Sequence, residues 1–243
     1  MTSAPNARVA VLLVAGVGSR LRPLTDDRPK ALVEVGGASI LARAVASLVA
    51  HGVERLVLAT GYREAAVRAA LERAPVPVEY FPNPRYASTQ NSVSLALCRD
   101  GVRGEAFYKL DGDVVFRPEV LARLDAARAP LAVAVDRTRA LDAEAMKVRL
   151  EGERIAAFGK GIPLEQSAGE TIGIERLDAA AGALVFDELA RAAARGETEL
   201  YYEDVYSRLV AAGALTASPV DVGDLPWTEI DDPSDLERAR ALV

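Results

Sequence analysis

Hydrophobic residues in the first half of the chain follow two alternating patterns. Short, nearly continuous apolar runs predict buried strands, which we expect at residues 8–15, 54–60, 76–81, 106–110 and 131–135. Longer segments between them repeat apolar residues at helical spacing, which predicts helices at residues 39–52, 63–74, 91–97 and 118–129. Strands that alternate with helices form β-α-β units, so this pattern predicts a mostly parallel sheet covered by helices on both faces.

The pattern changes in the second half of the chain. Two short apolar runs flank Glu151-Gly152 within residues 146–159, which predicts a β-hairpin. Beyond it we expect strands at residues 169–177, 215–222 and 226–231, and helices at residues 178–196, 201–213 and 233–242. Neither an internal repeat nor a linker rich in Gly, Ser or Pro interrupts the 243 residues, so we predict a single α/β domain.

Composition and charge exclude several classes of protein. Half of the residues are hydrophobic, which is enough for a full core, and the net charge of −6 argues against a nucleic-acid-binding protein. No apolar run approaches the roughly 18 to 20 residues of a membrane span, and residues 1–8 lack the pattern of a signal peptide. We therefore expect a cytoplasmic protein without nucleic-acid or membrane partners. The single cysteine, Cys98, lies in an apolar stretch and is predicted to be a buried thiol.

A dense group of cations follows the first predicted strand and its Gly16-Val17-Gly18 turn. The group consists of Arg20, Arg22, Arg28 and Lys30, with Pro23 and Pro29 among them. Neither a third glycine nor a Gly-Lys-Ser/Thr sequence follows, so the stretch fits neither a dinucleotide-binding turn nor a P-loop. A glycine turn with convergent cations suits the cleavage of a triphosphate, whose developing charge fixed cations stabilise. A solvated surface loop is the alternative, although loops of this length in compact domains are mostly functional.

Acidic residues occur at the ends of two predicted strands. Asp111 and Asp113 end the strand near residue 110, and Glu229 and Asp231 precede the last predicted helix. Carboxylates that face a phosphate-binding loop are suitable ligands for a hard cation such as Mg²⁺. For the first pair, a turn-forming Asp-Gly without a ligand is the alternative.

The order and spacing of these residues resemble a known family. The sequence G-x-G-S-R-L-x-P-L-T followed by P-K-A-L, from Gly16 to Leu32, resembles the signature of the sugar-phosphate nucleotidyltransferase superfamily, which includes MobA-like NTP transferases. Segments at residues 83–95, 145–160, 169–174, 201–205 and 225–236 are similar to small bacterial cytidylyltransferases that activate phosphocholine or 2-aminoethylphosphonate. The resemblance implies a single Rossmann-like domain in which helices sandwich a mostly parallel mixed sheet. It also implies a nucleotide-binding half at residues 8–136 and an acceptor-binding half, with a small β-hairpin region, at residues 137–243.

The resemblance further implies roles for individual residues. Arg20 and Lys30 would be the catalytic cations on the phosphates. The surrounding turn would bind the nucleotide through Ala15, Gly16, Gly18 and Ser19. A Mg²⁺ ion would be held by Asp113 and Asp231, with Glu229 nearby, and Asp111 would lie beside the nucleotide base or behind the metal ligands.

Candidate contacts to the base and to the acceptor lie further along the chain. The amides of Gln90 and Asn91, with Ser92 beside them, suit the carbonyl and amino groups of cytosine. Alternatively, Asn91 and Ser92 only cap the following helix, and a purine or uridine nucleotide is left open. For the acceptor we expect cations, carboxylates and aromatic faces from Lys147, Lys160, Glu170, Tyr201, Glu203 and Trp227. Solvated lysines and core aromatic residues are the alternatives.

Together these features predict a Mg²⁺-dependent cytidylyltransferase. It would transfer CMP from CTP to a small phosphorylated or phosphono amino alcohol, of the phosphocholine, phosphoethanolamine or 2-aminoethylphosphonate type, and release pyrophosphate. One alternative is a nucleotidyltransferase for inositol-1-phosphate or a sugar-1-phosphate. Another is a catalytically silent, nucleotide-binding regulatory subunit, and a homodimer is left open.

Overall fold

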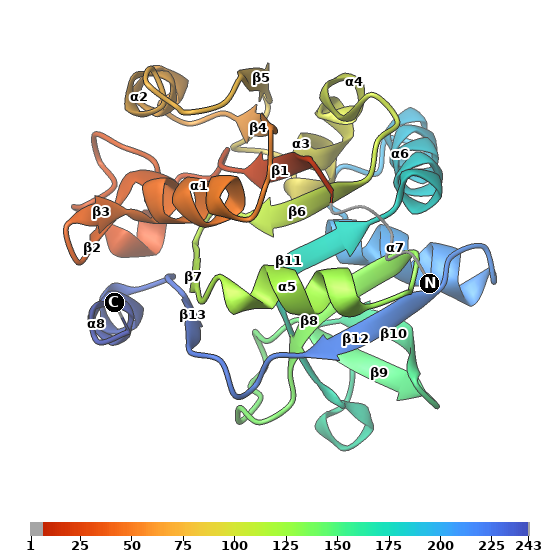
Figure 1. Ribbon diagram of the computed structural model, residues 1–243. Helices are drawn as coiled ribbons and strands as arrows, with labels where there is room; N and C mark the ends of the chain where they lie inside the picture. Colours follow the sequence, from red (N-terminus) through yellow and green to blue (C-terminus); the bar gives the residue numbers. More distant parts are fainter. Residues whose placement is uncertain (1–6, 243) are drawn as a thin grey trace.

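A computed structural model describes residues 7–242 as an α/β domain around a nine-stranded mixed sheet (Figure 1). The strands of this sheet, in spatial order, are β5 (Val78–Pro82), β4 (Arg55–Thr60), β1 (Val9–Leu13), β6 (Phe107–Asp111), β11 (Gly169–Leu177), β8 (Leu131–Asp136), β12 (Ala217–Asp221), β10 (Arg154–Gly159) and β9 (Lys147–Glu151). The first four are parallel, β11 runs antiparallel to both of its neighbours, and β9 and β10 form a hairpin.

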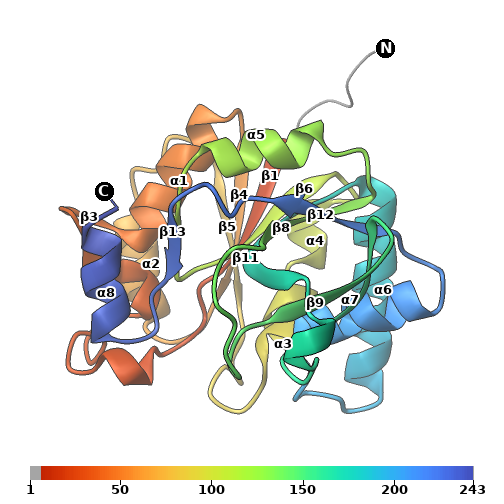
Figure 2. The same ribbon diagram turned by 90° about the horizontal axis from the view of Figure 1, so that it is seen from below.

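Helices cover both faces of the sheet, as Figure 2 shows from below. They are α1 (Ile40–Ala50), α2 (Glu64–Ala70), α3 (Asn91–Leu97), α4 (Arg99–Val102), α5 (Glu119–Ala126), α6 (Ala179–Ala194), α7 (Tyr202–Ala211) and α8 (Pro233–Arg240). Side chains of α1 and α5 pack into one buried cluster, and those of α3, α6 and α7 pack into a second. The expected single α/β domain with a helix-covered mixed sheet is confirmed.

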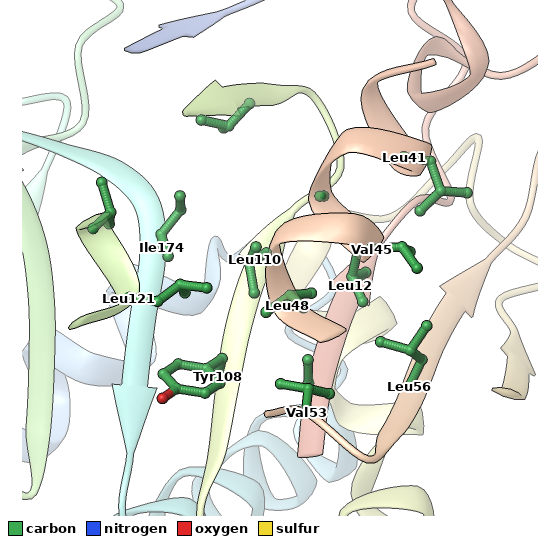
Figure 3. Packing of buried hydrophobic residues seen from close by; sticks show 14 of the residues in the cluster. Leu12, Leu41, Val45, Leu48, Val53, Leu56, Tyr108, Leu110, Leu121 and Ile174 are labelled. Atoms are coloured by element: carbon green, nitrogen blue, oxygen red, sulfur yellow. The ribbon is translucent and has the colours of Figure 1, made fainter. Parts of the chain in front are cut away.

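Alternation of side chains along β1 explains why its sequence is a continuous apolar run. Leu12 belongs to the cluster under α1 and α5, whereas Val11 belongs to the cluster under α3, α6 and α7. Figure 3 shows Leu12 among side chains of the first cluster, including Leu48 of α1 and Leu121 of α5. A strand buried on both faces has no polar side, so strict polar alternation is absent.

Each predicted helix and strand is present, generally with shorter bounds. The sequence patterns missed α4, the small antiparallel pair of β2 (Glu34–Val35) with β3 (Ala38–Ser39), and β7 (Val114–Phe116). The strand expected at residues 226–231 is β13 (Trp227–Glu229), and its antiparallel partner is β7. The predicted buried thiol of Cys98 is confirmed. Within the described residues, no helix is long and apolar enough to cross a membrane.

Two pairings join the second half of the chain to the first. Strand β11 lies between β6 and β8, so the predicted nucleotide-binding and acceptor-binding halves share one sheet. The β7–β13 pair places Glu229 opposite Val114, and the Ile230 N–H donates to the carbonyl oxygen of Asp113, 3.0 Å away. The C-terminal segment is thereby fixed beside the turn that follows β6.

The turn after β6 contacts the end of β1 at Gly112. The Gly112 N–H donates to the Leu13 carbonyl oxygen at 3.0 Å, and a Cβ at this position would lie 2.5 Å from that oxygen. We expect Gly112→Ala to lower the free energy of unfolding by about 1–3 kcal/mol, as overpacking does, because the turn must move away from β1. Urea denaturation measures the loss. The control is Gly161→Ala, whose Cβ would meet no atom within 4 Å, and equal stability of both variants would contradict the prediction.

Candidate active site

The loop after β1 is held in place by its own contacts and by the turn after β4. Gly18 has a left-handed conformation with φ of +70°, and a Cβ there would lie 2.7 Å from Cβ of Lys30. Thr25 Oγ1 donates to the Gly18 carbonyl oxygen at 2.8 Å, and the Tyr62 hydroxyl donates to the carbonyl oxygens of Thr25 and Asp26 at 3.0 and 2.7 Å. Glycine at position 18 is therefore required both by backbone conformation and by the close approach of Lys30.

Two of the four cations in this loop reach the acidic residues. Lys30 Nζ lies 2.6 Å from Asp113 Oδ2 and 2.7 Å from Asp231 Oδ1, and Arg20 lies 2.8 Å from Asp231 Oδ2. Burial opposes the charge on Lys30, but the two carboxylates outweigh burial and raise the pKa of Lys30, so its ammonium stays charged. The other two, Arg22 and Arg28, pair with exposed aspartates of their own loop.

The start of α8 fixes the position of Asp231. Asp235 Oδ2 accepts from the N–H groups of Asp231 and Asp232 at 2.8 and 2.9 Å, and Asp232 caps the helix in return. This reciprocal capping arrangement satisfies N–H groups that a helix end leaves free. Figure 1 shows β13 beside β7, with α8 following it.

Three carboxylates converge at this junction. One ligand atom each of Asp113, Glu229 and Asp231 lies within 4.8 Å of the others. In the described part of the chain, Asp113 Oδ1 is buried and has no hydrogen-bond partner. Clustered oxygen ligands with a buried, unsatisfied carboxylate oxygen fit a hard divalent cation such as Mg²⁺.

A cavity of about 310 Å³ opens between the loop, α3 and the turn after β6. Its lining includes Ala15, Gly16, Lys30, Gln90, Asn91, Asp111 and Asp113 from the predicted set. Gly18 instead packs against the stem of Lys30, and Ser19 is exposed in a short 3-10 helix at Ser19–Leu21.

Around α3 the structure corrects the predicted contacts. Ser92 is buried and is not part of the cavity lining; Ser94 and Thr89 line the cavity instead. Both hydroxyls accept hydrogen bonds from the Asn83 amide, at 3.1 and 3.0 Å. The predicted capping role for Asn91 is met at a different helix, since its Oδ1 accepts from the Tyr202 N–H of α7 at 3.0 Å.

A second cavity of about 400 Å³ adjoins the first at Asn91, Asp111, Asp113 and Glu229. Five of the six predicted acceptor residues line it, namely Lys160, Glu170, Tyr201, Glu203 and Trp227. Arg139 and Glu144 also line it and were missed, because exposed charged residues in an irregular segment give no periodic signal.

Lys147, the sixth predicted acceptor residue, does not reach this cavity. It is 2% exposed, and its ammonium donates to the carbonyl oxygens of Asp142 and Ala145 at 2.9 and 3.1 Å. Lys147 therefore holds the backbone of residues 142–145, the segment that precedes β9, by these two hydrogen bonds.

Below the second cavity lies a buried charged cluster that the sequence did not indicate. Lys109 Nζ is 3.1 Å from both Asp111 Oδ1 and Glu175 Oε2, and it lies 3.4 Å from the centre of the Tyr202 ring. The Tyr202 hydroxyl donates to Asp111 Oδ2 at 2.8 Å. In the sequence, Lys109 is a charged residue within the apolar run of β6, whereas Glu175 lies among other polar residues of β11 and gives no separate signal.

The fold and this cleft define the class of the protein: a nucleotidyltransferase-type α/β domain with its site at the carboxyl ends of parallel strands. Residues 10–212 match the MobA-like NTP transferase domain, and the chain belongs to this family. This result confirms the resemblance seen in the sequence.

Curated relatives include proteins of bacterial origin that are about twice as long or longer. The chain is 35% identical over 246 residues to CMP-5'-(3-aminopropyl)phosphonate synthase of Streptomyces rubellomurinus, covering 95% of this chain and 38% of that protein. It is 33% identical over 244 residues to the bifunctional IPC transferase and DIPP synthase of Rubrobacter xylanophilus, covering 96% and 51%. The chain thus spans between about a third and a half of the length of these relatives.

Solved structures of similar size have the same fold. The inositol-1-phosphate CTP transferase of T. maritima superposes with a TM-score of 0.80 at 26% identity, covering 98% of this chain and 97% of that one. CTP:phosphocholine cytidylyltransferase of Streptococcus pneumoniae superposes with a TM-score of 0.74 at 21% identity, covering 97% and 99%, a likeness of fold alone.

Asp136, at the end of β8, holds Trp227 in the second cavity. Its Oδ2 accepts from Trp227 Nε1 at 2.7 Å, while Oδ1 accepts from the N–H and hydroxyl of Thr138, both at 2.8 Å, and from the Arg139 N–H at 3.2 Å. Burial alone would raise the pKa of Asp136, but these hydrogen bonds outweigh burial and hold it below its usual value.

We expect Asp136→Asn to lower the free energy of unfolding at pH 7 by about 1–3 kcal/mol, since it removes hydrogen bonds to a charged group. A native pKa below the unfolded value of about 3.9 stabilises the folded state above that pH and loses this effect as pH falls. The difference from the wild type should therefore shrink below about pH 4. Fluorescence of Trp227, the only tryptophan, follows unfolding. Exposed Asp100→Asn is the control, and a pH-independent difference for Asp136→Asn would count against this account.

Proposed function

We propose that this protein is a Mg²⁺-dependent cytidylyltransferase. It transfers CMP from CTP to the phosphate or phosphonate of a small amino alcohol and releases pyrophosphate. The observation that carries the proposal is the meeting of Lys30 with Asp113 and Asp231 where the two cavities join, since it puts a fixed cation and three carboxylates at one point. Location in the cytoplasm and a homodimer stay predictions.

The reaction needs no nucleophile from the protein. An oxygen of the acceptor phosphate attacks the α-phosphorus of CTP, a new P–O bond forms, and the bond from the α-phosphorus to the bridging oxygen breaks as pyrophosphate leaves. Lys30 and Arg20 hold the phosphates and stabilise the charge that moves onto pyrophosphate. The backbone at Gly16, which has open space around it, allows close approach of a phosphate.

Asp113, Glu229 and Asp231 would hold the Mg²⁺ ion. When bound, the ion would neutralise part of the negative charge of the two reacting phosphates and so reduce their repulsion. The protein's remaining contribution is positioning, because both substrates must be aligned for in-line attack. Fixed placement of these residues by the β7–β13 pair and by the start of α8 supports this role.

The charge of the second cavity supports an amino alcohol as acceptor. Its lining has more carboxylates than cations, and among the described residues Glu170 and Glu203 each have a buried oxygen without a hydrogen-bond partner. A neutral polyol would not need this excess of negative charge. The name of the Streptomyces rubellomurinus relative, an aminopropylphosphonate synthase, supports the same acceptor class, whereas the IPC transferase relatives keep inositol-1-phosphate as the alternative.

CTP is supported by two lines of argument. The side-chain amides of Gln90 and Asn91 line the first cavity, and amides offer both a donor and an acceptor to a base edge. The Streptomyces rubellomurinus relative is named for a CMP product, and the T. maritima structure is named as a CTP transferase. A silent regulatory subunit is disfavoured, because the cations and acids of the site converge in one place.

The proposal is tested by measuring pyrophosphate release for CTP, UTP, ATP and GTP against a panel of acceptors. The panel contains phosphoethanolamine, phosphocholine, 2-aminoethylphosphonate, inositol-1-phosphate and glucose-1-phosphate. We expect turnover with CTP and an amino acceptor, and only in the presence of Mg²⁺. Turnover restricted to inositol-1-phosphate or glucose-1-phosphate would contradict the amino alcohol as acceptor and favour the alternative, a nucleotidyltransferase for a polyol or sugar phosphate.

Lys30→Met and Asp113→Asn should each lower kcat for pyrophosphate release by about 100-fold or more, because each removes a fixed charge at the reacting phosphates. Arg22→Met and Asp27→Asn are matched controls, since both residues are exposed in the same loop and pair outside the cleft. Circular dichroism checks that all four variants fold. Near-normal turnover in either cleft variant would contradict the mechanism.

Trp227→Ala should raise KM for the acceptor by about 10-fold while KM for CTP changes little, because the indole lines only the second cavity. Steady-state kinetics with each substrate varied in turn measures the split. An unchanged KM for the acceptor would show that Trp227 does not contribute to binding of the acceptor.

A further inference from the structure

Besides Asp113 of the three-carboxylate site, two carboxylates in the second cavity have an oxygen that no described side chain or backbone group satisfies. Glu203 is 4% exposed, and its Oε2 is buried without a hydrogen-bond partner. Glu170 is 9% exposed, and its Oε1 lies 3.6 Å from Arg139 Nε, beyond hydrogen-bond distance. Buried carboxylate oxygens are costly when unsatisfied, so both invite N–H or O–H donors from a ligand.

Among the described residues, Glu203 has no cation of its own, because the buried ammonium near it is already paired with other carboxylates. The ammonium of Lys109, fully buried on β6, is already shared by Asp111 on the same strand and by Glu175 on β11, each 3.1 Å away. The nearby phenols of α7, Tyr202 and Tyr206, are buried and neutral. Three carboxylates thus surround one ammonium.

Burial raises the pKa of Glu203, Lys109 opposes that rise only in part, and Asp111 and Glu175 add to it, so the pKa reaches about 8. A second cation entering from the cavity would favour the ionised form of Glu203. The cluster is therefore complementary to a positively charged ligand group.

The aromatic faces of the same cavity already have cations beside them. Lys160 Nζ lies 5.3 Å from the centre of the Tyr201 ring, and Arg139 Cζ lies 5.0 Å from the centre of the Trp227 ring. A quaternary ammonium has no N–H and is bound mainly by free aromatic faces. A primary ammonium has three N–H donors, which match unsatisfied carboxylate oxygens.

We infer that the second cavity selects an acceptor whose cationic group has N–H bonds, a primary ammonium, over one with a trimethylammonium group, and that Glu203 and Glu170 receive it. This inference rests on the proposed function, because it concerns the acceptor of that reaction. Glu203 and Glu170 are then specificity-determining residues: they decide which amino alcohol is bound, while the reacting phosphates meet Lys30 and Asp113 elsewhere in the cleft.

The first experiment measures kcat/KM at saturating CTP and Mg²⁺ for phosphoethanolamine, its N-methyl and N,N-dimethyl derivatives, and phosphocholine. We expect kcat/KM to fall with each added methyl group and by about 100-fold over the series. Each methyl group replaces an N–H donor, which leaves a carboxylate oxygen of the protein without a hydrogen bond. Equal or better turnover of phosphocholine would overturn the inference and leave the proposed function intact. No pyrophosphate release with any member would instead count against the proposed function.

The second experiment repeats the series with Glu203→Gln and Glu170→Gln. Each variant should lower kcat/KM for phosphoethanolamine by at least about 10-fold and lower kcat/KM for phosphocholine much less, because phosphocholine loses only charge attraction and no N–H hydrogen bond, so the ratio between the two substrates shrinks. A general structural defect would lower kcat/KM equally for phosphoethanolamine and phosphocholine, and that result would contradict the assignment of Glu203 and Glu170 to the ammonium site. Glu153→Gln, in the exposed turn between β9 and β10, is the matched control and should keep the wild-type ratio. If Glu203→Gln does not fold, Glu170→Gln and the wild-type series decide the question.

Discussion

The ammonium of Lys30 joins parts of the chain that are about as far apart in sequence as the chain allows. It lies between Asp113, which follows β6, and Asp231, which precedes α8, and 201 positions separate Lys30 from Asp231. A mostly buried charge is tolerated only when it is paired, so these three side chains constrain one another. The loop after β1, the β7–β13 pair and the capped start of α8 must all be in place before the contact can form.

Charge is distributed unequally on the two sides of this contact. Lys30 and backbone groups line the first cavity, where a triphosphate would bring several negative charges, and Arg20 lies next to it in the second cavity, paired with Asp231. Carboxylates predominate in the second cavity, and within the described structure Asp113, Glu170 and Glu203 each have an oxygen without a hydrogen-bond partner. Such a division orients a ligand that is negative at one end and positive at the other, because either end is repelled by the wrong side.

How much of this arrangement can be predicted from sequence depends on the range of the interaction. Helices such as α1 and strands such as β1 follow from local periodicity, and the glycine turn with Lys30 follows from a motif. The β7–β13 pair does not: the strand at β13 was expected, but the three-residue β7 was not, and their pairing joins distant segments of the chain. Lys147 was assigned to the acceptor site because the sequence shows residue type and not direction, and its ammonium points to backbone carbonyls instead. Lys109 and Glu175 were missed because their ion pair forms only when β6 and β11 are neighbours in the sheet, and the sequence does not show this pairing.

The loop after β1 and the outer wall of the second cavity are held by different contacts, although the two cavities share Asn91, Asp111, Asp113 and Glu229. The catalytic loop is fixed by Thr25 and by Tyr62 after β4, whereas the acceptor side is fixed by Asp136, by Lys147 and by the Lys109 cluster. Substitutions on the acceptor side can therefore change which ligand is bound without disturbing the loop that holds the phosphates. Relatives that are 30 to 35% identical to the chain are named for an aminopropylphosphonate product in one case and for IPC transfer in others. Under the proposed function, a phosphate-binding loop combined with a differently built acceptor wall would account for that variety within one fold, because fold alone does not fix the substrate.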